Sequence, residues 1–321
     1  MSAPAAPTIA GGPVTPLDAP SHRRGDRIFA GLARGAGVLI LVLLAGVALF
    51  LVVESVPALT ASSSELPQGK SFAHYVGPLA FGTAFAAAIA LLIAAPVSIG
   101  VALFISHYSP RRLAGVLGYL IDLLAAVPSV VFGLWGIFWL APQLQPGMAW
   151  LGTHLSFIPF FAGPVSATGR TILTAGVVLA VMILPIMTAI CREIFLQTPR
   201  LHEEAALALG ATRWEVVRMS VLPHGRSGVI SAAMLGLGRA LGETMAVAMV
   251  LSVGGGVSVN LISPQNPSTI AANIALQFPE SSGVAVNALI ATGLVLFVIT
   301  FLVNFAARAV VARRKDFREG S

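Results

Sequence analysis

Long apolar runs alternate with short segments that carry most of the charges of this chain. A helix that crosses a bilayer needs about 20 predominantly apolar residues. Because several runs reach that length, we expect an all-α, polytopic membrane protein with six transmembrane helices. The expected spans are 35–53, 77–106 with an interruption at Pro96, 113–140, 171–191 with a kink at Pro185, 227–253 and 284–307.

The composition supports a membrane protein. Hydrophobic residues make up 56% of the chain and charged residues only 10%, whereas a typical soluble domain has about 25% charged residues. The net charge of +6 does not indicate nucleic-acid binding, because the basic residues lie in short clusters between apolar runs rather than in one patch. A single cysteine, Cys191, excludes a disulfide framework and is interpreted as a small apolar residue.

The basic clusters predict the orientation in the membrane. They precede the first expected span, follow the second, separate the fourth from the fifth and follow the sixth. Cytoplasmic segments carry the excess of Lys and Arg, so both termini are expected in the cytoplasm. We expect three parts: a disordered cytoplasmic tail (1–27), a transmembrane domain (28–309) and a basic cytoplasmic tail (310–321). On the outer side, 268–277 is expected to form a short amphipathic helix.

A polar, helix-prone island, residues 204–223, interrupts the apolar pattern. Gly210 is a natural helix stop, because glycine tolerates the left-handed conformation that follows a helix. Thr212 and Glu215 have the T-x-x-E spacing of a capping box, which predicts a second helix. Pro223 is expected to end that helix. The island therefore predicts a helix–turn–helix in water, where another protein can dock.

Two opposite charges lie inside the fifth expected span. Arg239 and Glu243 are four residues apart, so on a helix they share one face. Each costs about 2.5–3.5 kcal/mol at a helix centre in a bilayer, and we therefore expect them to line a water-filled path rather than to pair only for packing. Gly236, Gly238 and Gly242 are expected to let neighbouring helices approach closely.

Two other charged residues have open assignments. Arg170, at the outer mouth of the fourth expected span, is interpreted either as an anion contact or as an interfacial anchor. Asp122 is expected to be a structural partner of Arg239 or of a backbone group, because a carboxylate repels anions.

No signature of an enzyme emerges. The segment Gly69-Lys70-Ser71 resembles the end of a Walker A motif, but Ser64 occupies the position of its first glycine. The histidines lack metal-ligand spacing, and His202, Glu203 and Glu204 are interpreted as a surface salt-bridge group. We expect no catalytic residue, metal or cofactor in this chain, with ATP–Mg bound by a partner.

The island resembles the EAA loop of ABC-importer permeases. Glu204, Ala205, Ala206, Gly210, Leu222 and Pro223 match the pattern, and Ser220 stands where the family often has Ile. The string GRALGETMAV at 238–247 is similar to the PstC permease subunits of Pst phosphate importers, and Met245, Ala246 and Val247 favour PstC over the sister subunit PstA.

This resemblance implies a type I ABC-importer permease fold in a bacterial plasma membrane. It implies that the EAA-like loop, residues 195–226, docks into a separate ATPase. The implied coupling residues are Glu204, Ala205, Ala206, Gly210, Trp214, Leu222 and Pro223, and the implied pathway residues are Arg239, Glu243 and Arg170.

The implied function is phosphate import, in which planar Arg239 offers paired donors to an oxyanion and Glu243 balances it when the passage is empty. The implied partners are a PstA-like permease, an ATPase dimer and an extracytoplasmic phosphate-binding protein. The alternatives are a permease for molybdate or sulfate, or a proton-coupled secondary transporter in which Arg239 and Glu243 form a proton relay.

Overall fold

The computed structural model describes residues 24–319, and within that range the regular structure is helical, apart from an isolated bridge between Val253 and Asn266. The backbone contacts divide the chain after Phe50. The helix α1 (Arg24–Thr60) crosses this division, and its side chains up to Phe50 are largely exposed, as expected for a lipid-facing helix. The site described below lies entirely in the second unit. Of the expected tails, residues 1–23 and 320–321 lie outside the described range.

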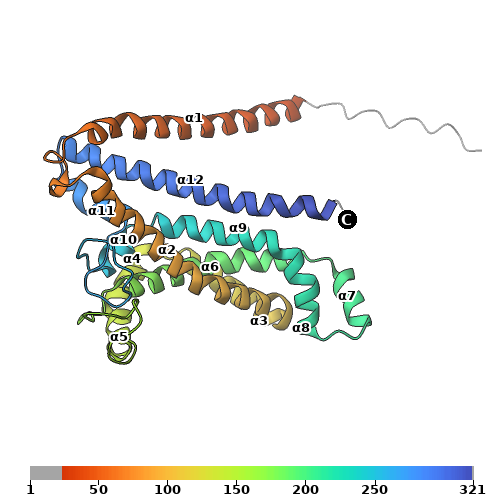
Figure 1. Cartoon of the computed structure of the whole chain (residues 1–321). Helices are drawn as coiled ribbons and strands as arrows, with labels where there is room; N and C mark the ends of the chain where they lie inside the picture. The colour runs from red at the N-terminus through yellow and green to blue at the C-terminus, as the bar shows by residue number, and fades with distance from the viewer. Residues whose placement is uncertain (1–23, 320–321) are drawn as a thin grey trace, which may run out of the picture. The chain divides into compact units, whose positions relative to one another are not determined.

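Within residues 24–319, four helices are long and apolar enough to cross a membrane. They are α1, α2 (Phe72–Leu103) with the π-helical turn η2 (Phe104–Tyr108), α6 (Ile172–Leu196) and α12 (Val284–Glu319). A fifth candidate consists of α3 (Arg111–Ala125) and the run Ser129–His154, which meet at a bend of 92°. That run contains α4 (Ser129–Trp135), η3 (Gly136–Leu140) and α5 (Ala141–His154). Figure 1 shows these elements. The expected count of six spans is thus roughly supported.

Pro96 behaves differently from the expectation. Pro96 was expected to interrupt the second span, but α2 continues through both Pro78 and Pro96. The break comes instead inside the third expected span, where α3 ends before Pro128. Proline disfavours the helical conformation of the residue that precedes it, which accounts for the end of α3 before Pro128. In α2, small residues pack in the core and stabilise the unbroken helix.

The core is formed where α2 crosses α6. Ala86, Ala87, Ala90 and Ala94 of α2 are at most 1% exposed. On α6, a Cβ added to Gly176 would lie 2.4 Å from Cγ2 of Ile89. Small residues at such a crossing let two backbones approach closely, as is typical of membrane helices.

The helix α9 (Leu222–Leu241) packs against α6 in the same way. A Cβ added to Gly228 would meet Ile194, and one added to Gly236 would lie 2.9 Å from the Met187 side chain. The predicted close approach is therefore confirmed at Gly236. The prediction is wrong at Gly238, because no atom lies within 4 Å of a Cβ added there. It is also wrong at Gly242, where the only atom within 4 Å is the carbonyl oxygen of Gly238 in the preceding turn.

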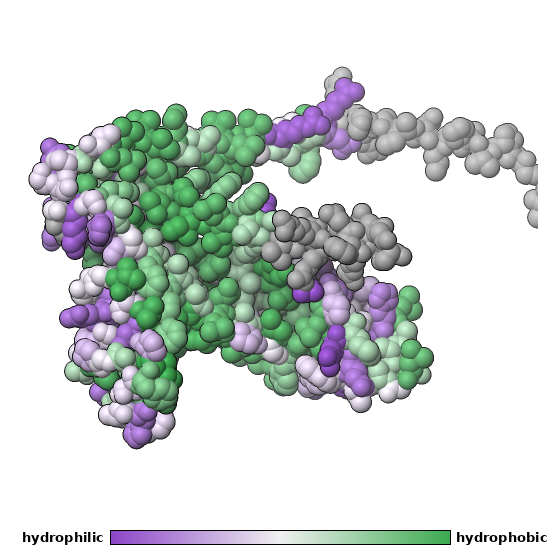
Figure 2. All heavy atoms as spheres, in the orientation of Figure 1, coloured by the Kyte–Doolittle hydropathy of each residue, from purple (hydrophilic) through white to green (hydrophobic). Residues whose placement is uncertain are grey.

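The segment that follows α9 forms a cap of short elements. It contains α10 (Met245–Val250), α11 (Ile270–Gln277) and the 3-10 turn η5 (Phe278–Glu280); a similar turn, η1 (Pro67–Gly69), precedes α2. The expected short helix at 268–277 is confirmed as α11, which Thr269 caps. Buried Asn266 holds the cap to α6 by accepting a hydrogen bond from the amide of Ile172. Figure 2 shows hydrophilic atoms around these loops and at α7 and α8, with apolar atoms between them.

Candidate functional site

The first helix of the EAA-like loop, α7 (Arg200–Ala208), ends as its sequence predicts. Gly210 has φ of 86°, in the left-handed region. Its amide donates to the carbonyl of Leu207 at 2.9 Å, and the amide of Ala211 donates to that of Ala206 at 3.1 Å. These two bonds form a Schellman motif, which satisfies carbonyls that the helix end would leave unpaired.

The second helix, α8 (Arg213–Val216), begins with the predicted capping box. The backbone amide of Thr212 donates to the Glu215 carboxylate at 2.7 Å, and its hydroxyl donates to the same oxygen at 2.8 Å. The amide of Glu215 donates in return to the Thr212 hydroxyl at 3.4 Å. These bonds to its charged form lower the pKa of Glu215, first through the Thr212 backbone and then through its hydroxyl.

Pro223 does not end this helix, contrary to the prediction. The helix α8 continues through a π-helical turn, η4 (Val217–Val221), directly into α9, which has Pro223 in its first turn. Proline lacks an amide and clashes with the carbonyl four residues earlier. The preceding π turn, in which the amide of Leu222 donates to the carbonyl of Val217, widens the helix at that position. One helical run therefore extends from Arg213 to Leu241.

Three large apolar side chains are exposed on the EAA-like loop. Leu209 is 90% exposed, Leu201 76% and Trp214 57%. A groove of about 460 Å³ lies between α7 and the start of α9. Its lining residues are Leu201, His202, Ala205, Ala206, Met219, Ser220, Pro223 and His224. Ala205, Ala206 and Pro223 thus share one hollow, which fits their expected role in receiving a partner, whereas Leu222 lines a separate hollow with Arg226.

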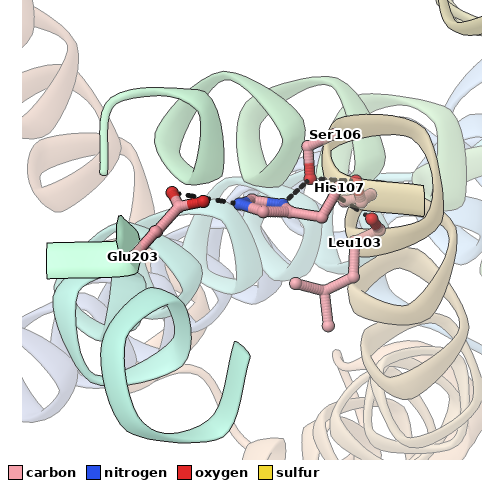
Figure 3. Close-up of polar contacts among 5 residues, drawn as sticks. Leu103, Ser106, His107 and Glu203 are labelled. Atoms are coloured by element: carbon pink, nitrogen blue, oxygen red, sulfur yellow. Dashed lines mark hydrogen bonds and ion pairs between the residues drawn. The ribbon is translucent and has the colours of Figure 1, made fainter. Parts of the chain in front are cut away.

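An ion pair joins α7 to the end of α2 (Figure 3). Nε2 of His107 lies 3.5 Å from Oε1 of Glu203, and the two side chains are 14% and 26% exposed. Nδ1 of His107 is 2.7 Å from the hydroxyl of Ser106, which donates to the carbonyl of Ala102. Glu203 was expected to join His202 and Glu204 in a surface group, and this pairing with a distant residue has no local sequence signal.

The charged pair of the fifth span is arranged differently from the prediction. The helix α9 ends at Leu241, so Arg239 and Glu243 do not share a helix face. Glu243, 9% exposed, instead accepts a hydrogen bond at 3.1 Å from the amide of Ala246, in the first turn of α10. A carboxylate stabilises a helix N-terminus by pairing a free amide and by its charge. Glu243 therefore anchors the break between α9 and α10.

Arg239 lines an open cavity, the Arg239 cavity, of about 890 Å³ between α6, α9 and α12. Its guanidinium Nε is buried and has no hydrogen-bond partner. A buried donor without a partner carries a free-energy cost that a bound acceptor removes. The lining residues are Ile186, Ile230, Ser231, Met234, Leu235, Gly238, Arg239, Asn304, Ala307 and Arg308. Arg308 was grouped with the basic C-terminal cluster from its sequence, so its place in this cavity was missed.

The two remaining charged candidates lie apart from this cavity. Arg170 donates through Nη2 to the carbonyl of Met249 at 2.9 Å and so stabilises the end of α10. Asp122 is exposed on α3, and the described residues show no ion pair between it and Arg239, so that expected pairing is wrong. Within residues 24–319 no cluster of three or more His, Cys, Asp or Glu side chains is placed to hold a metal ion.

Comparisons with known proteins fit this arrangement. Residues 95–316 match the family of binding-protein-dependent transport system inner membrane components. The phosphate transport system permease protein PstC 2 of Mycobacterium tuberculosis is 48% identical over 92% of this chain and 94% of its own length. PstC of Mycobacterium leprae is 46% identical over 91% and 95%, and PstC of Mesorhizobium japonicum is 41% identical over 92% of each chain.

A solved bacterial ABC transporter involved in alginate import is 16% identical, with a TM-score of 0.49, and covers 88% of this chain and 99% of its own. That likeness is too low to add to the assignment, which the family model and the PstC relatives carry. The chain is a transport subunit: it belongs to the inner-membrane components of binding-protein-dependent transport systems and, within them, to the PstC permeases of ABC importers.

Proposed function

We propose that this chain is the permease subunit that conducts inorganic phosphate through an ATP-driven importer. The PstC relatives are phosphate permeases by name, with identities of 41–48% over most of the chain. The observation that carries the mechanism is the helical run from the capping box at Thr212 to Arg239, which ends beside the Arg239 cavity.

That run supports mechanical coupling between a docked ATPase and the anion path. The run bends between α8 and α9 (Figure 1), and from Leu222 to Arg239 the helix α9 rises about 26 Å at 1.5 Å per residue. A displacement of the EAA-like loop is therefore passed through the bend at η4 to α9 and along α9 to the guanidinium. ATP–Mg binds and is hydrolysed on the partner ATPase, and closure of the ATPase pair rocks α9 between outward and inward openings.

Arg239 supplies the chemistry of the path. A guanidinium gives paired, planar donors that match two oxygens of an oxyanion. Arg239 lines the cavity, so its guanidinium can donate to an arriving phosphate. Glu243 accepts a hydrogen bond from the first turn of α10. Its proposed role is to position the break between α9 and α10 rather than to pair with Arg239.

The proposed assembly places this chain in a bacterial plasma membrane with both termini cytoplasmic. A PstA-like permease completes the passage, two ATPase subunits bind the EAA-like loops, and an extracytoplasmic phosphate-binding protein delivers the anion. The orientation is tested with the variant R213C in intact cells, in a background where the buried Cys191 is replaced. Labelling of that thiol by an impermeant reagent from outside would overturn the topology.

The direct test measures phosphate uptake by the assembled importer in proteoliposomes. We expect R239A to abolish uptake while the complex still assembles, and R239K to retain partial uptake because it keeps the charge but loses the planar fork. Normal uptake by R239A would refute the role of Arg239. If molybdate or sulfate, and not phosphate, stimulates ATPase activity, the substrate assignment falls. Uptake that persists without ATP and follows the proton gradient would favour a secondary transporter.

A further inference from the structure

A second arginine faces the Arg239 cavity from the opposite wall. Asn304, Ala307 and Arg308 of α12 all line it, and their spacing of three and four residues places them on one helix face. Asn304 is partly buried and Arg308 is exposed. Across the cavity lie Ser231 and Gly238 of α9, and no atom occupies the space beside Gly238.

The polar groups that line this cavity favour an anion. Arg239, Arg308 and Asn304 can donate hydrogen bonds to a ligand, whereas the hydroxyl of Ser231 already donates to the carbonyl of Ser227, and no carboxylate lines the cavity. Among the side chains that the structure describes, neither Arg239 nor Arg308 forms an ion pair with an acid. Two guanidinium groups and a side-chain amide match the several acceptor oxygens of a phosphate-type oxyanion.

Beyond Arg308, α12 continues toward its C-terminal end on the side of the EAA-like loop (Figure 1). In Figure 1, α9 and α12 are neighbours, and the C-terminal end of α12 lies on the same side as α7 and α8. The helix α9 leaves the EAA-like loop at Leu222 and reaches Arg239 only near its other end. From Ser231 to Arg239, α9 rises about 12 Å. The two arginines therefore belong to different walls of the cavity, Arg239 to α9 and Arg308 to α12, rather than to a single binding point.

We propose that Arg308 and Asn304 form a second oxyanion-binding site at the inner mouth of the Arg239 cavity. The site takes a phosphate-type group: either the transported anion as it leaves Arg239, or the headgroup of an anionic lipid. Occupation of this site by the transported anion rests on the proposed function. In that case, the two arginines hold the anion in succession, so that leaving one site is compensated by binding at the next.

The experiment uses the assembled importer in vesicles of phosphatidylcholine, and in matched vesicles that also contain phosphatidylglycerol. The chain has one cysteine, the fully buried Cys191, so R308C in a C191A background provides a single reactive thiol. We expect R308C to lower phosphate uptake by about tenfold, the loss of a charge-assisted hydrogen bond. Attaching an aminoethyl group through a methanethiosulfonate should restore much of the uptake, and a neutral methyl group should not.

Protection of the thiol identifies the ligand. Slower modification in phosphatidylcholine vesicles when millimolar inorganic phosphate is added would establish the transported anion as the occupant. Protection only in phosphatidylglycerol vesicles would establish a lipid headgroup at the same site. The matched control is R112C, at an exposed arginine in the first turn of α3 outside the cavity, which should show neither loss nor protection.

Unchanged uptake by R308C together with no protection in either vesicle would overturn the site. The variant N304L checks the amide separately and should weaken protection of R308C by phosphate. The two proposals fail in distinguishable ways. Normal uptake by R239A with protected R308C removes the proposed role of Arg239 but keeps this site, whereas a dead R239A with unprotected, fully active R308C removes only the second site.

Discussion

The ion pair between His107 and Glu203 is expected to hold the EAA-like loop ready for docking. Its atoms are 3.5 Å apart, and its side chains are 14% and 26% exposed, between the fully exposed and fully buried cases. Exposed pairs contribute about 0.2–1 kcal/mol, whereas breaking a buried pair costs about 3–5 kcal/mol. Glu203 stays partly hydrated after His107 is removed, so we expect a coupling energy of about 1 kcal/mol, or about fivefold in an equilibrium constant.

The assay is the affinity of the purified permease, in nanodiscs, for its ATPase subunit. Because the pair joins α7 to the end of α2, its loss leaves α7 to be ordered when the ATPase binds, and binding weakens. H107A and E203A should each raise Kd about fivefold. The variant that combines both changes should also raise Kd about fivefold, because either single change already removes the pair.

Two outcomes would refute this reasoning. Purely multiplicative effects, about 25-fold for the combined variant, would show that the two side chains act independently. Unchanged affinity in both single variants would show that the pair does not order α7. The control is E193Q, at an exposed carboxylate of α6 that makes no ion pair with the described residues, and it should bind the ATPase normally.

The turn, the capping box and the helix crossing each support one more prediction. G210A should destabilise the turn by about 1–2 kcal/mol and weaken ATPase affinity, because an alanine strains the backbone at φ of 86°. An added Cβ meets no atom within 4 Å there, so strain and not a clash is the cause, and G210N should lower the affinity less. The control G115A, in the interior of α3 with the same open space, should leave ATPase affinity unchanged. Because the folded-state pKa of Glu215 is lowered, its carboxylate should support the capping box at neutral pH and lose it only as pH falls below about 4.3, the ordinary Glu value. Hydrogen exchange of the Thr212 amide, corrected for intrinsic rate, should therefore remain slow down to about pH 5. Loss of protection already at about pH 7 would contradict this. G176A should lower the free energy of unfolding by about 1–3 kcal/mol, because its Cβ would lie 2.4 Å from Cγ2 of the stiff, β-branched Ile89. Thermal denaturation in detergent measures this loss of stability. Additive losses in the variant that combines G176A with I89A would argue against the clash.

The helix–turn–helix of the EAA-like loop could be derived from its sequence because its signals are local. A glycine that must adopt positive φ and a capping box four residues long depend on neighbours along the chain. The structure confirms Gly210, Thr212 and Glu215 in those roles. The same holds for most of the expected spans, since length and hydropathy suffice to predict where a helix can cross a bilayer.

The prolines could not be assigned in the same way. Pro96 lies within a helix that packs closely against α6, Pro128 follows a helix end, and Pro223 follows a π turn. Proline is costly inside a helix but tolerated at a helix start, and Pro128 and Pro223 lie at such starts whereas Pro96 lies inside α2. Where each helix starts depends on the packing around it, which the local sequence does not give.

The hydropathy and capping pattern of the sequence determined the helical class, most of the membrane segments and the turn that faces a partner. Only the tertiary structure decided that Glu243 caps α10 instead of pairing with Arg239, that His107 reaches Glu203, and that Arg308 shares a cavity with Arg239. The physical reason is the distance along the chain over which each signal acts. Periodicity and capping act over a few residues, whereas the charge and donor complement of a site depends on which helices pack together and where each one ends.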